Sequence, residues 1–126
     1  MSAAAELLRL QLRAAQGIIS KMEIGTCRKM QDAIGKLWAG VLRDKVRFET
    51  VEGLPFPAEE TEPKDGGILY LHGGGYTAGG VEYARGFGSI MTEHTGYSTL
   101  CIEYRLAPED PYPAALEDAL TAYLYM

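Results

Sequence analysis

Cysteine is scarce in this sequence, and acidic residues outnumber basic ones. The 126 residues contain two cysteines, Cys27 and Cys101, and carry a formal net charge of −5. Nucleic acids and anionic membranes select for a basic protein surface, so the charge argues against both as partners. Two thiols that lie far apart in the sequence fit a reducing compartment better than a disulfide scaffold.

Long apolar runs are missing as well. No stretch approaches about 18 uninterrupted apolar residues, so no membrane span is predicted. Glu6 and Arg9 interrupt the segment 1–12, which argues against a secretory signal peptide. No spaced cluster of histidine, cysteine or carboxylate residues is present, so neither a metal nor another cofactor is predicted. With an apolar content of 47%, these absences predict a soluble cytoplasmic domain.

Two amphipathic helical patterns occupy the N-terminal third of the sequence. Apolar residues recur at helix spacing over residues 3–19, and the spacing returns after a break at Gly25 and continues from Met30 to about residue 42. Trp38 lies on the apolar stripe of the second pattern, which is expected to pack on a neighbouring body. We therefore expect a helical region over residues 1–44 and a different architecture over residues 45–126.

The hydrophobic period changes to two after Lys45, which predicts β-strands. Val46 and Phe48 alternate with charged neighbours and predict a first strand. The proline-interrupted segment around Phe56 and Ala58 predicts a second strand that can lie only at an edge of a sheet. The polar residues 59–64 predict a surface turn.

A unit of strand, loop, helix and strand follows. Ile68–Leu71 is a short apolar run bounded by turn residues, which is typical of a buried strand. A helix is predicted over about 83–94, with Gly96 as its C-cap, and Ser98–Tyr104 predicts the next strand. Such a βαβ unit implies a parallel strand pair with a right-handed crossover.

The last predicted element is a helix that begins near Pro113, because proline suits the first helical turn. Its expected buried stripe consists of Leu116, Ala119, Leu120, Tyr123 and Leu124. No glycine cap or basic last turn precedes the end at Met126, so the sequence is expected to stop within a helix.

The loop of the βαβ unit contains three consecutive glycines after His72, and such a loop is suited to present backbone amides to negative charge. One interpretation is a dinucleotide-binding fingerprint, formed by Gly73, Gly75, Ala78 and, as ribose acceptor, Glu103. Gly79 and Gly80 weaken this interpretation. They prolong the loop and delay the helix whose N-terminus would meet the pyrophosphate.

The other interpretation is an oxyanion hole. The same amides would stabilise the tetrahedral intermediate of acyl transfer, and one such donor is typically worth ~3 kcal/mol. The sequence HGGG at a strand-to-helix loop is a known donor arrangement of lipases and esterases. The imidazole of His72 is expected to hold the turn rather than to abstract a proton.

A second motif, YRLAPE, runs from Tyr104 to Glu109 directly after the second strand of the unit. HGGG and YRLAPE together resemble the hormone-sensitive-lipase-like family of carboxylesterases, over about residues 45–126 and more loosely over the N-terminal helices. The resemblance implies an α/β class with an incomplete α/β-hydrolase sheet. That sheet would have two N-terminal strands and then a parallel βαβ pair, preceded by N-terminal cap helices. It also implies a small acyl-ester substrate.

The resemblance also implies roles for single residues. The amides of Gly73, Gly74 and Gly75 would form the oxyanion hole. The loop that follows the strand Ser98–Tyr104 would be held by Glu103, Tyr104, Arg105, Pro108 and Glu109. Arg105 in particular is expected to anchor a turn through carboxylates. The N-terminal helices would form a cap over the acyl pocket. Tyr76 of the glycine loop and Trp38 of the second helix would line that pocket. A tryptophan on an apolar stripe is, however, also common in an ordinary hydrophobic core.

No serine-histidine-aspartate triad can be assembled from this sequence on family lines. The family's nucleophile lies in a G-x-S-x-G turn, and that frame surrounds none of Ser2, Ser20, Ser89 and Ser98. His72 belongs to the loop motif, and His94 lies at a helix end. We therefore expect the N-terminal part of an esterase, which supplies the oxyanion-hole loop but does not turn over esters alone.

A second hypothesis is a non-catalytic module. In the family's sheet the strand Ile68–Leu71 has a neighbour on each side, and only the strand Ser98–Tyr104 is available here. An open apolar edge predicts self-association, or complementation of a separate chain. The acyl-chain and alcohol specificity are open at this point.

Overall fold

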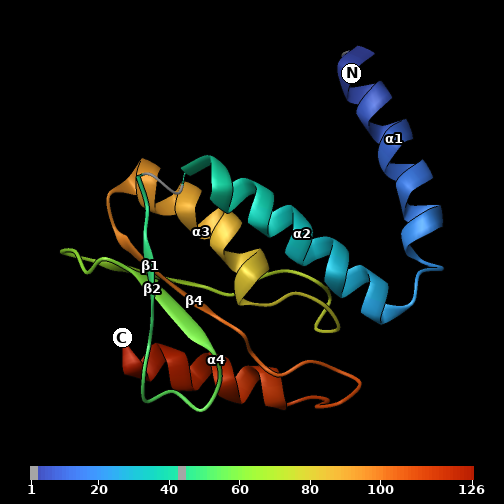
Figure 1. Cartoon of the computed structure of the whole chain (residues 1–126). Helices are drawn as coiled ribbons and strands as arrows, with labels where there is room; N and C mark the ends of the chain where they lie inside the picture. The colour runs from blue at the N-terminus through green and yellow to red at the C-terminus, as the bar shows by residue number, and fades with distance from the viewer. Residues whose placement is uncertain (1–2, 43–44) are drawn as a thin grey trace.

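The computed structural model describes residues 3–42 and 45–126 as helices flanking a four-stranded sheet (Figure 1). Its elements are α1 Ala3–Ile19, α2 Ile24–Leu42, β1 Phe48–Thr50, β2 Ala58–Thr61, β3 Gly67–Tyr70, α3 Val81–Thr95, β4 Ser98–Ile102 and α4 Ala114–Tyr125. Each predicted helix is confirmed, and α2 and α3 begin earlier than their apolar patterns indicate. Within the described ranges, no helix has both the length and the apolar character that crossing a membrane requires.

The sheet has the strand order β1-β2-β4-β3. β3 pairs with β4 in parallel, with Ile68 opposite Thr99 and Tyr70 opposite Cys101. β2 pairs antiparallel with β1 and with β4. The predicted parallel βαβ pair is therefore confirmed, and so are two preceding strands.

The expected edge position of the second strand is wrong, because β2 lies between β1 and β4. Pro57 precedes β2, and its carbonyl accepts a hydrogen bond from the Glu103 amide at 2.8 Å, so the missing proline donor does not interrupt the ladder. The turn expected over residues 59–64 is also wrong in its first half. Thr61 is buried, where its hydroxyl accepts from the Thr99 amide at 2.9 Å, and Glu59 is paired with Arg85 of α3. Glu59 and Thr61 are accommodated in this strand because both side chains meet polar partners.

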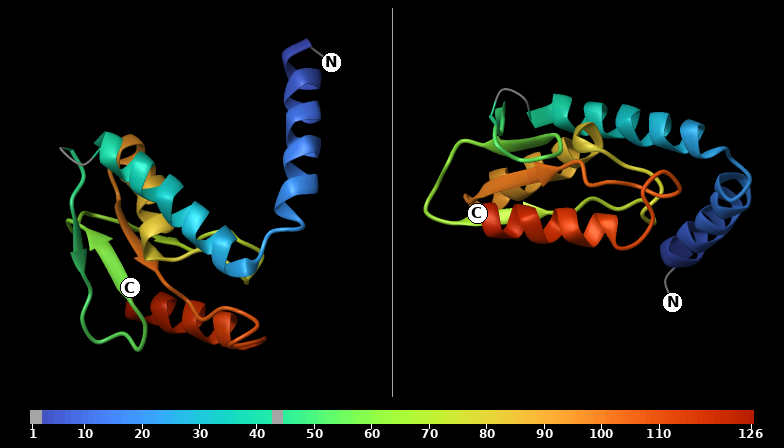
Figure 2. Two further views of the ribbon diagram at one scale, coloured as in Figure 1. Left: turned by 45° about the vertical axis from the view of Figure 1, so that its right-hand side comes forward. Right: turned by 90° about the horizontal axis from the view of Figure 1, so that it is seen from below.

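β4 is buried along its whole length and separates two apolar layers. Leu100 and Ile102 point to one face, where they pack with Ala122 of α4. Cys101 points to the opposite face and packs with Val81 and Ala84 of α3. This alternation follows from the two-residue period of a strand. Figure 2 shows α3 and α2 on one side of the sheet and α4 on the other.

α2 crosses α3 closely through Gly35. A Cβ atom at this position would lie 2.3 Å from the Glu82 carbonyl oxygen and 2.4 Å from the Tyr83 Cα. Gly86 of α3 adds to the close approach, because its Cβ would lie 3.1 Å from the Cβ of Trp38. α1 extends away from the other elements in Figures 1 and 2, and its leucines are exposed.

The buried stripe expected for α4 is wrong. Exposed side chains on this helix include Leu116, Leu120, Tyr123 and Leu124, and Ala119 is half-buried. The buried residues are instead Ala114, Asp118 and Ala122. The small alanines allow close packing on the sheet, and the Asp118 carboxylate binds Arg105 in the segment that follows β4. The leucines therefore face outward.

Candidate active site

The glycine loop begins at the C-terminal end of β3 and takes a backbone path that side chains oppose. Gly74 has φ = 135°, and a Cβ atom there would lie 1.9 Å from the Ala78 carbonyl oxygen. Gly75 has φ = 62°, and Tyr76 also has a positive φ of 61°. A bulky residue in this left-handed region stores strain, which the surrounding contacts must offset.

A tight turn closes around the Gly74 carbonyl. Its oxygen accepts hydrogen bonds from the amides of Thr77 and Ala78, both at 3.2 Å, and from the Thr77 hydroxyl at 3.1 Å. The amides of Gly73, Gly74 and Gly75 donate no hydrogen bond to any residue that the structure describes. Three consecutive donors are therefore available to an acceptor outside the loop.

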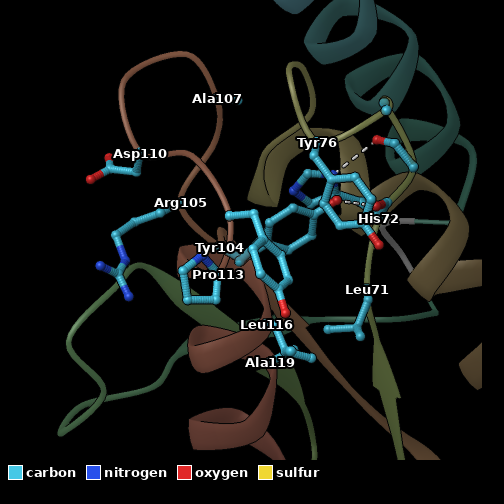
Figure 3. A pocket seen from close by; sticks show the side chains of 15 residues that line it. Leu71, His72, Tyr76, Tyr104, Arg105, Ala107, Asp110, Pro113, Leu116 and Ala119 are labelled. Carbon is cyan, nitrogen blue, oxygen red and sulfur yellow. Dashed lines mark hydrogen bonds between the residues drawn. The ribbon is translucent and has the colours of Figure 1, made fainter.

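The loop forms one wall of a cavity of about 720 Å³, lined also by the segment after β4 and by the first turns of α4. Figure 3 shows the rings of Tyr76 and Tyr104 beside His72, with Leu71, Leu116 and Ala119 below them in this view. The outward-facing Leu116 is thus part of the cavity wall. Its apolar side chains and the unpaired glycine amides suit a ligand with an apolar body and a polar head.

The side chain of His72 stabilises the start of the glycine loop. The side chain is 3% exposed, and its Nδ1 lies 3.0 Å from the Gly73 carbonyl oxygen. A carbonyl can only accept, so Nδ1 carries the proton and Nε2 is the bare nitrogen; Nε2 is buried and lacks a partner among the described residues. Burial lowers the pKa of the imidazole below its ordinary value. His72 is therefore neutral at pH 7.

Tyr104 supports His72 from the first position of the second motif. Its ring stacks on the imidazole with a centroid distance of 4.1 Å and an interplanar angle of 12°. The Tyr104 hydroxyl donates a hydrogen bond to the His72 carbonyl oxygen. Burial raises the pKa of Tyr104 to about 12, so the hydroxyl keeps its proton and remains a donor at neutral pH.

Glu103 meets the N-terminus of α3, where its Oε2 accepts a hydrogen bond from the Val81 amide at 3.1 Å. The positive end of the helix dipole and a free amide both favour a carboxylate at this place. α3 begins at Val81, after the loop has turned through Gly79 and Gly80. The helix N-terminus thus faces the chain's own carboxylate. This geometry favours the oxyanion interpretation over the dinucleotide one.

Arg105 points away from His72 and Tyr76 (Figure 3). Its guanidinium binds the Asp118 carboxylate, with the shortest contact at 2.8 Å, and reaches Glu117 at 3.2 Å. The Arg105 amide also donates to Asp118, at 2.8 Å. Hydrogen bonding to Asp118 raises the pKa of the guanidinium above its ordinary value. Backbone and side chain together fix the chain between β4 and α4.

Pro108 and Glu109 continue this segment, and Glu109 is bound from α2. Arg28 donates to both Glu109 oxygens, at 2.9 Å and 2.8 Å, and this hydrogen bonding lowers the pKa of Glu109 to about 2. The same guanidinium donates to the carbonyls of Thr77, at 2.8 Å, and Ala107, at 3.1 Å. Nothing in the sequence pattern singles out Arg28, because it lies 81 positions from Glu109.

Comparison with known proteins supports the same assignment. Residues 68–126 match a family model described as the alpha/beta hydrolase fold. The chain is 45% identical over 56 residues to an acetyl-hydrolase of Streptomyces hygroscopicus, covering 44% of this chain and 19% of that protein. It is 41% identical over 69 residues to a versiconal hemiacetal acetate esterase of Aspergillus parasiticus, covering 55% of this chain and 22% of that protein.

Solved structures agree with the sequence matches. An esterase/lipase from an uncultured bacterium superposes with a TM-score of 0.73 at 32% identity, covering 83% of this chain and 36% of that one. A hyperthermophilic esterase from the archaeon Pyrobaculum calidifontis gives a TM-score of 0.66 at 28% identity, covering 89% of this chain and 40% of that one. The chain has an α/β-hydrolase fold. It spans two fifths or less of the length of these relatives.

The resemblance to α/β-hydrolase carboxylesterases that the two motifs predict is thereby confirmed. Within this fold, Tyr76 lines the cavity and Trp38 does not; the indole is 53% exposed on α2, with its Cβ facing Gly86 of α3. The two aromatic residues named for the acyl pocket are therefore not brought together.

The serines that the structure describes do not line the cavity. Ser89 is buried in α3, where its hydroxyl donates to the Arg85 carbonyl at 2.7 Å, and Ser98 bonds Gly66 at the start of β4. Ser20 follows α1 and donates to Gly17, and Ser2 lies outside the described residues. No serine among those described is within hydrogen-bonding contact of a histidine.

Proposed function

We propose that this chain supplies the oxyanion-hole loop, and part of the acyl-binding surface, of a carboxylic-ester hydrolase. The observation that carries the proposal is the set of amides at Gly73, Gly74 and Gly75. They border the cavity and have no acceptor within the described chain. A substrate carbonyl oxygen that turns anionic there would accept their hydrogen bonds, each worth ~3 kcal/mol in a transition state.

We also propose that the catalytic serine, aspartate and histidine are not among these 126 residues. The support is the burial of Ser89 and Ser98 away from the cavity and the neutral, buried state of His72, whose protonated Nδ1 is committed to Gly73. The alcohol nucleophile of acyl transfer needs a base within hydrogen-bond reach, and no described pair of residues meets that requirement. A cytoplasmic location stays a prediction from composition.

The first test is hydrolysis of p-nitrophenyl butyrate by the purified chain. We expect a rate equal to that of the buffer blank, because the amides alone provide no nucleophile. A rate above the blank that a serine-directed reagent abolishes would show that the chain carries its own nucleophile and would contradict the second part of the proposal.

The second test grafts this chain into the Pyrobaculum calidifontis esterase in place of the matched segment. The graft is expected to hydrolyse the same ester, and Gly74→Ala within it should lower kcat by about 100-fold or more, because the amides are displaced. Gly17→Ala on the exposed α1 is the control, since its Cβ meets nothing within 4 Å. A graft that folds, by circular dichroism and a cooperative melt, but is inactive argues against the proposed loop function.

A second candidate function is self-association or complementation of a separate chain. It is favoured by the edge position of β3 in the sheet and by the exposed leucines of α4. An edge strand offers unpaired amides and carbonyls to another chain. Light scattering over a range of concentrations tests this: a mass that rises with concentration supports it, and a constant monomer mass rejects self-association.

A further inference from the structure

Arg28 joins three segments that are far apart in the sequence. It lies on α2, and its guanidinium bonds the end of the glycine loop at Thr77 and the second motif at Ala107 and Glu109. The bonds are 2.8 Å to Thr77, 3.1 Å to Ala107, and 2.9 Å and 2.8 Å to the two Glu109 oxygens. Four bonds from one planar group fix its position far more narrowly than a simple ion pair does.

The two loops that Arg28 holds also bind each other. The Ala107 amide donates to the Tyr76 carbonyl at 2.8 Å, directly beside the Thr77 and Ala107 carbonyls that Arg28 binds. Tyr76 has the positive φ of 61°, a strained conformation for a residue other than glycine. Contacts on both sides of the strained residue are therefore what keeps the loop in this conformation.

We propose that Arg28 is a positioning residue of the glycine loop. It holds the Thr77 and Ala107 carbonyls in place, and so keeps Tyr76 in the left-handed region and the Gly73–Gly75 amides directed at the cavity. The consequence for ester hydrolysis rests on the proposed function; the effect on the loop does not. The helix that carries Arg28 thus takes part in shaping the site, although it contributes no residue to the cavity lining.

A plain ion pair predicts different behaviour. The Arg28 and Glu109 side chains are 29% and 59% exposed, and exposed pairs contribute little to stability. If the charge of Arg28 alone mattered, lysine would replace it, and loss of Glu109 would be as harmful as loss of Arg28. If the planar fork matters, lysine cannot bind both carbonyls and the carboxylate at once.

The test measures amide hydrogen exchange by NMR in the intact 126-residue chain. In Arg28→Met the Ala107 and Ala78 amides, which report on the two loop contacts, should exchange about tenfold faster or more, while Gly96 at the far end of α3 keeps its rate. Lys29→Met, on the neighbouring exposed cation, is the control and should leave all three rates unchanged. Arg28→Lys should restore the Ala107 and Ala78 rates only in part.

Glu109→Gln completes the set and keeps the inference testable if Arg28→Met fails to fold. This variant removes the ion pair but leaves both carbonyl contacts, so it should accelerate exchange less than Arg28→Met does. Rates in Arg28→Met equal to those of the wild type would overturn the proposal. Full rescue by lysine, or an equal rise at Gly96, would overturn it too.

The grafted esterase separates this inference from the proposed function. There, Arg28→Met should lower kcat more than it changes KM, because the amides act on the transition state. An inactive wild-type graft combined with faster loop exchange in Arg28→Met would reject the proposed function and keep the positioning role. An active graft whose kcat is unaffected by Arg28→Met would reject the positioning role and keep the function.

Discussion

Gly74 is the position in the loop that tolerates a side chain least. Its φ of 135° opposes any side chain, and a Cβ atom would lie 1.9 Å from the Ala78 carbonyl oxygen. Gly74→Ala should therefore lower the free energy of unfolding by ~2 kcal/mol or more. Gly73→Ala is the matched control, because its Cβ meets nothing within 4 Å, and it should stay within about 1 kcal/mol of the wild type. Guanidinium chloride unfolding measures both, and equal losses would contradict the geometry.

His72 should make the stability of the chain depend on pH. Burial lowers its pKa in the folded state, so the unfolded chain binds a proton first as the pH falls below the ordinary value of about 6.5. The stabilising contribution is complete above that pH and is lost as the pH falls toward the folded-state pKa, with a slope of up to ~1.4 kcal/mol per pH unit.

Unfolding free energies of wild type and His72→Asn between about pH 7.5 and 5 measure this contribution. The slope should be steeper in the wild type, because asparagine does not titrate. Identical slopes in wild type and His72→Asn would mean that the buried imidazole takes up its proton as readily as it does in the unfolded chain.

The roles of single residues were predictable from the sequence where the residues belong to one contiguous motif. The glycine loop and Tyr104 stand in contiguous motifs, and the structure brings both to one cavity. Arg28 and Asp118 carry no such signal. Each is defined by partners on another element, Arg28 by carbonyls of two loops and Asp118 by the guanidinium and amide of Arg105. Periodicity reports which residues are apolar and says nothing about which ones meet.

At the scale of elements, the crossing of α2 over α3 depends on Gly35. A Cβ there would lie 2.3 Å from the Glu82 carbonyl oxygen, so Gly35→Ala should push the helices apart and lower the free energy of unfolding by ~1–3 kcal/mol. Gly40→Ala on the same helix meets nothing within 4 Å and should be neutral or stabilising by up to ~1 kcal/mol. Denaturation followed by the fluorescence of Trp38, the single tryptophan, measures both.

If Gly40→Ala lowered the free energy of unfolding as much as Gly35→Ala does, the close crossing of α2 over α3 would not explain the effect of Gly35→Ala. The position of α2 against α3 also affects the site, because α2 carries Arg28. If the helices separate, the Arg28 contacts to Thr77 and Ala107 should weaken along with the crossing.

Elements were predictable in kind but not in orientation. Apolar spacing found the four helices that the structure describes, and the order strand, helix, strand predicted the parallel strand pair. It placed the wrong face of α4 inward, because the small Ala122 and the paired Asp118 pack better against the sheet than the leucines do. It also mistook residues 59–61 of β2 for part of a turn, since Glu59 and Thr61 are polar; their partners Arg85 and Thr99 come from α3 and β4.

The whole molecule combines an open strand edge with an apolar helix surface. β3 ends the strand order, and the exposed Leu120 and Leu124 lie on α4, which packs on the same sheet. Exposed apolar area of this kind favours association, and a net charge of −5 opposes it through repulsion between copies. The balance between apolar attraction and charge repulsion depends on pH, because the net charge approaches zero near the calculated pI of about 5.0.

Association should therefore strengthen as the pH falls from about 8 to about 5.5, where the repulsion is small. Leu120→Lys and Thr121→Lys add the same charge at neighbouring exposed positions of α4. The added charge alone brings the net charge closer to zero and should promote association in both variants. Only Leu120→Lys removes apolar surface, so it should weaken association despite the smaller repulsion. Light scattering against concentration measures the difference, and equal masses for the two variants at pH 5.5 would mean that the leucine face of α4 is not the contact.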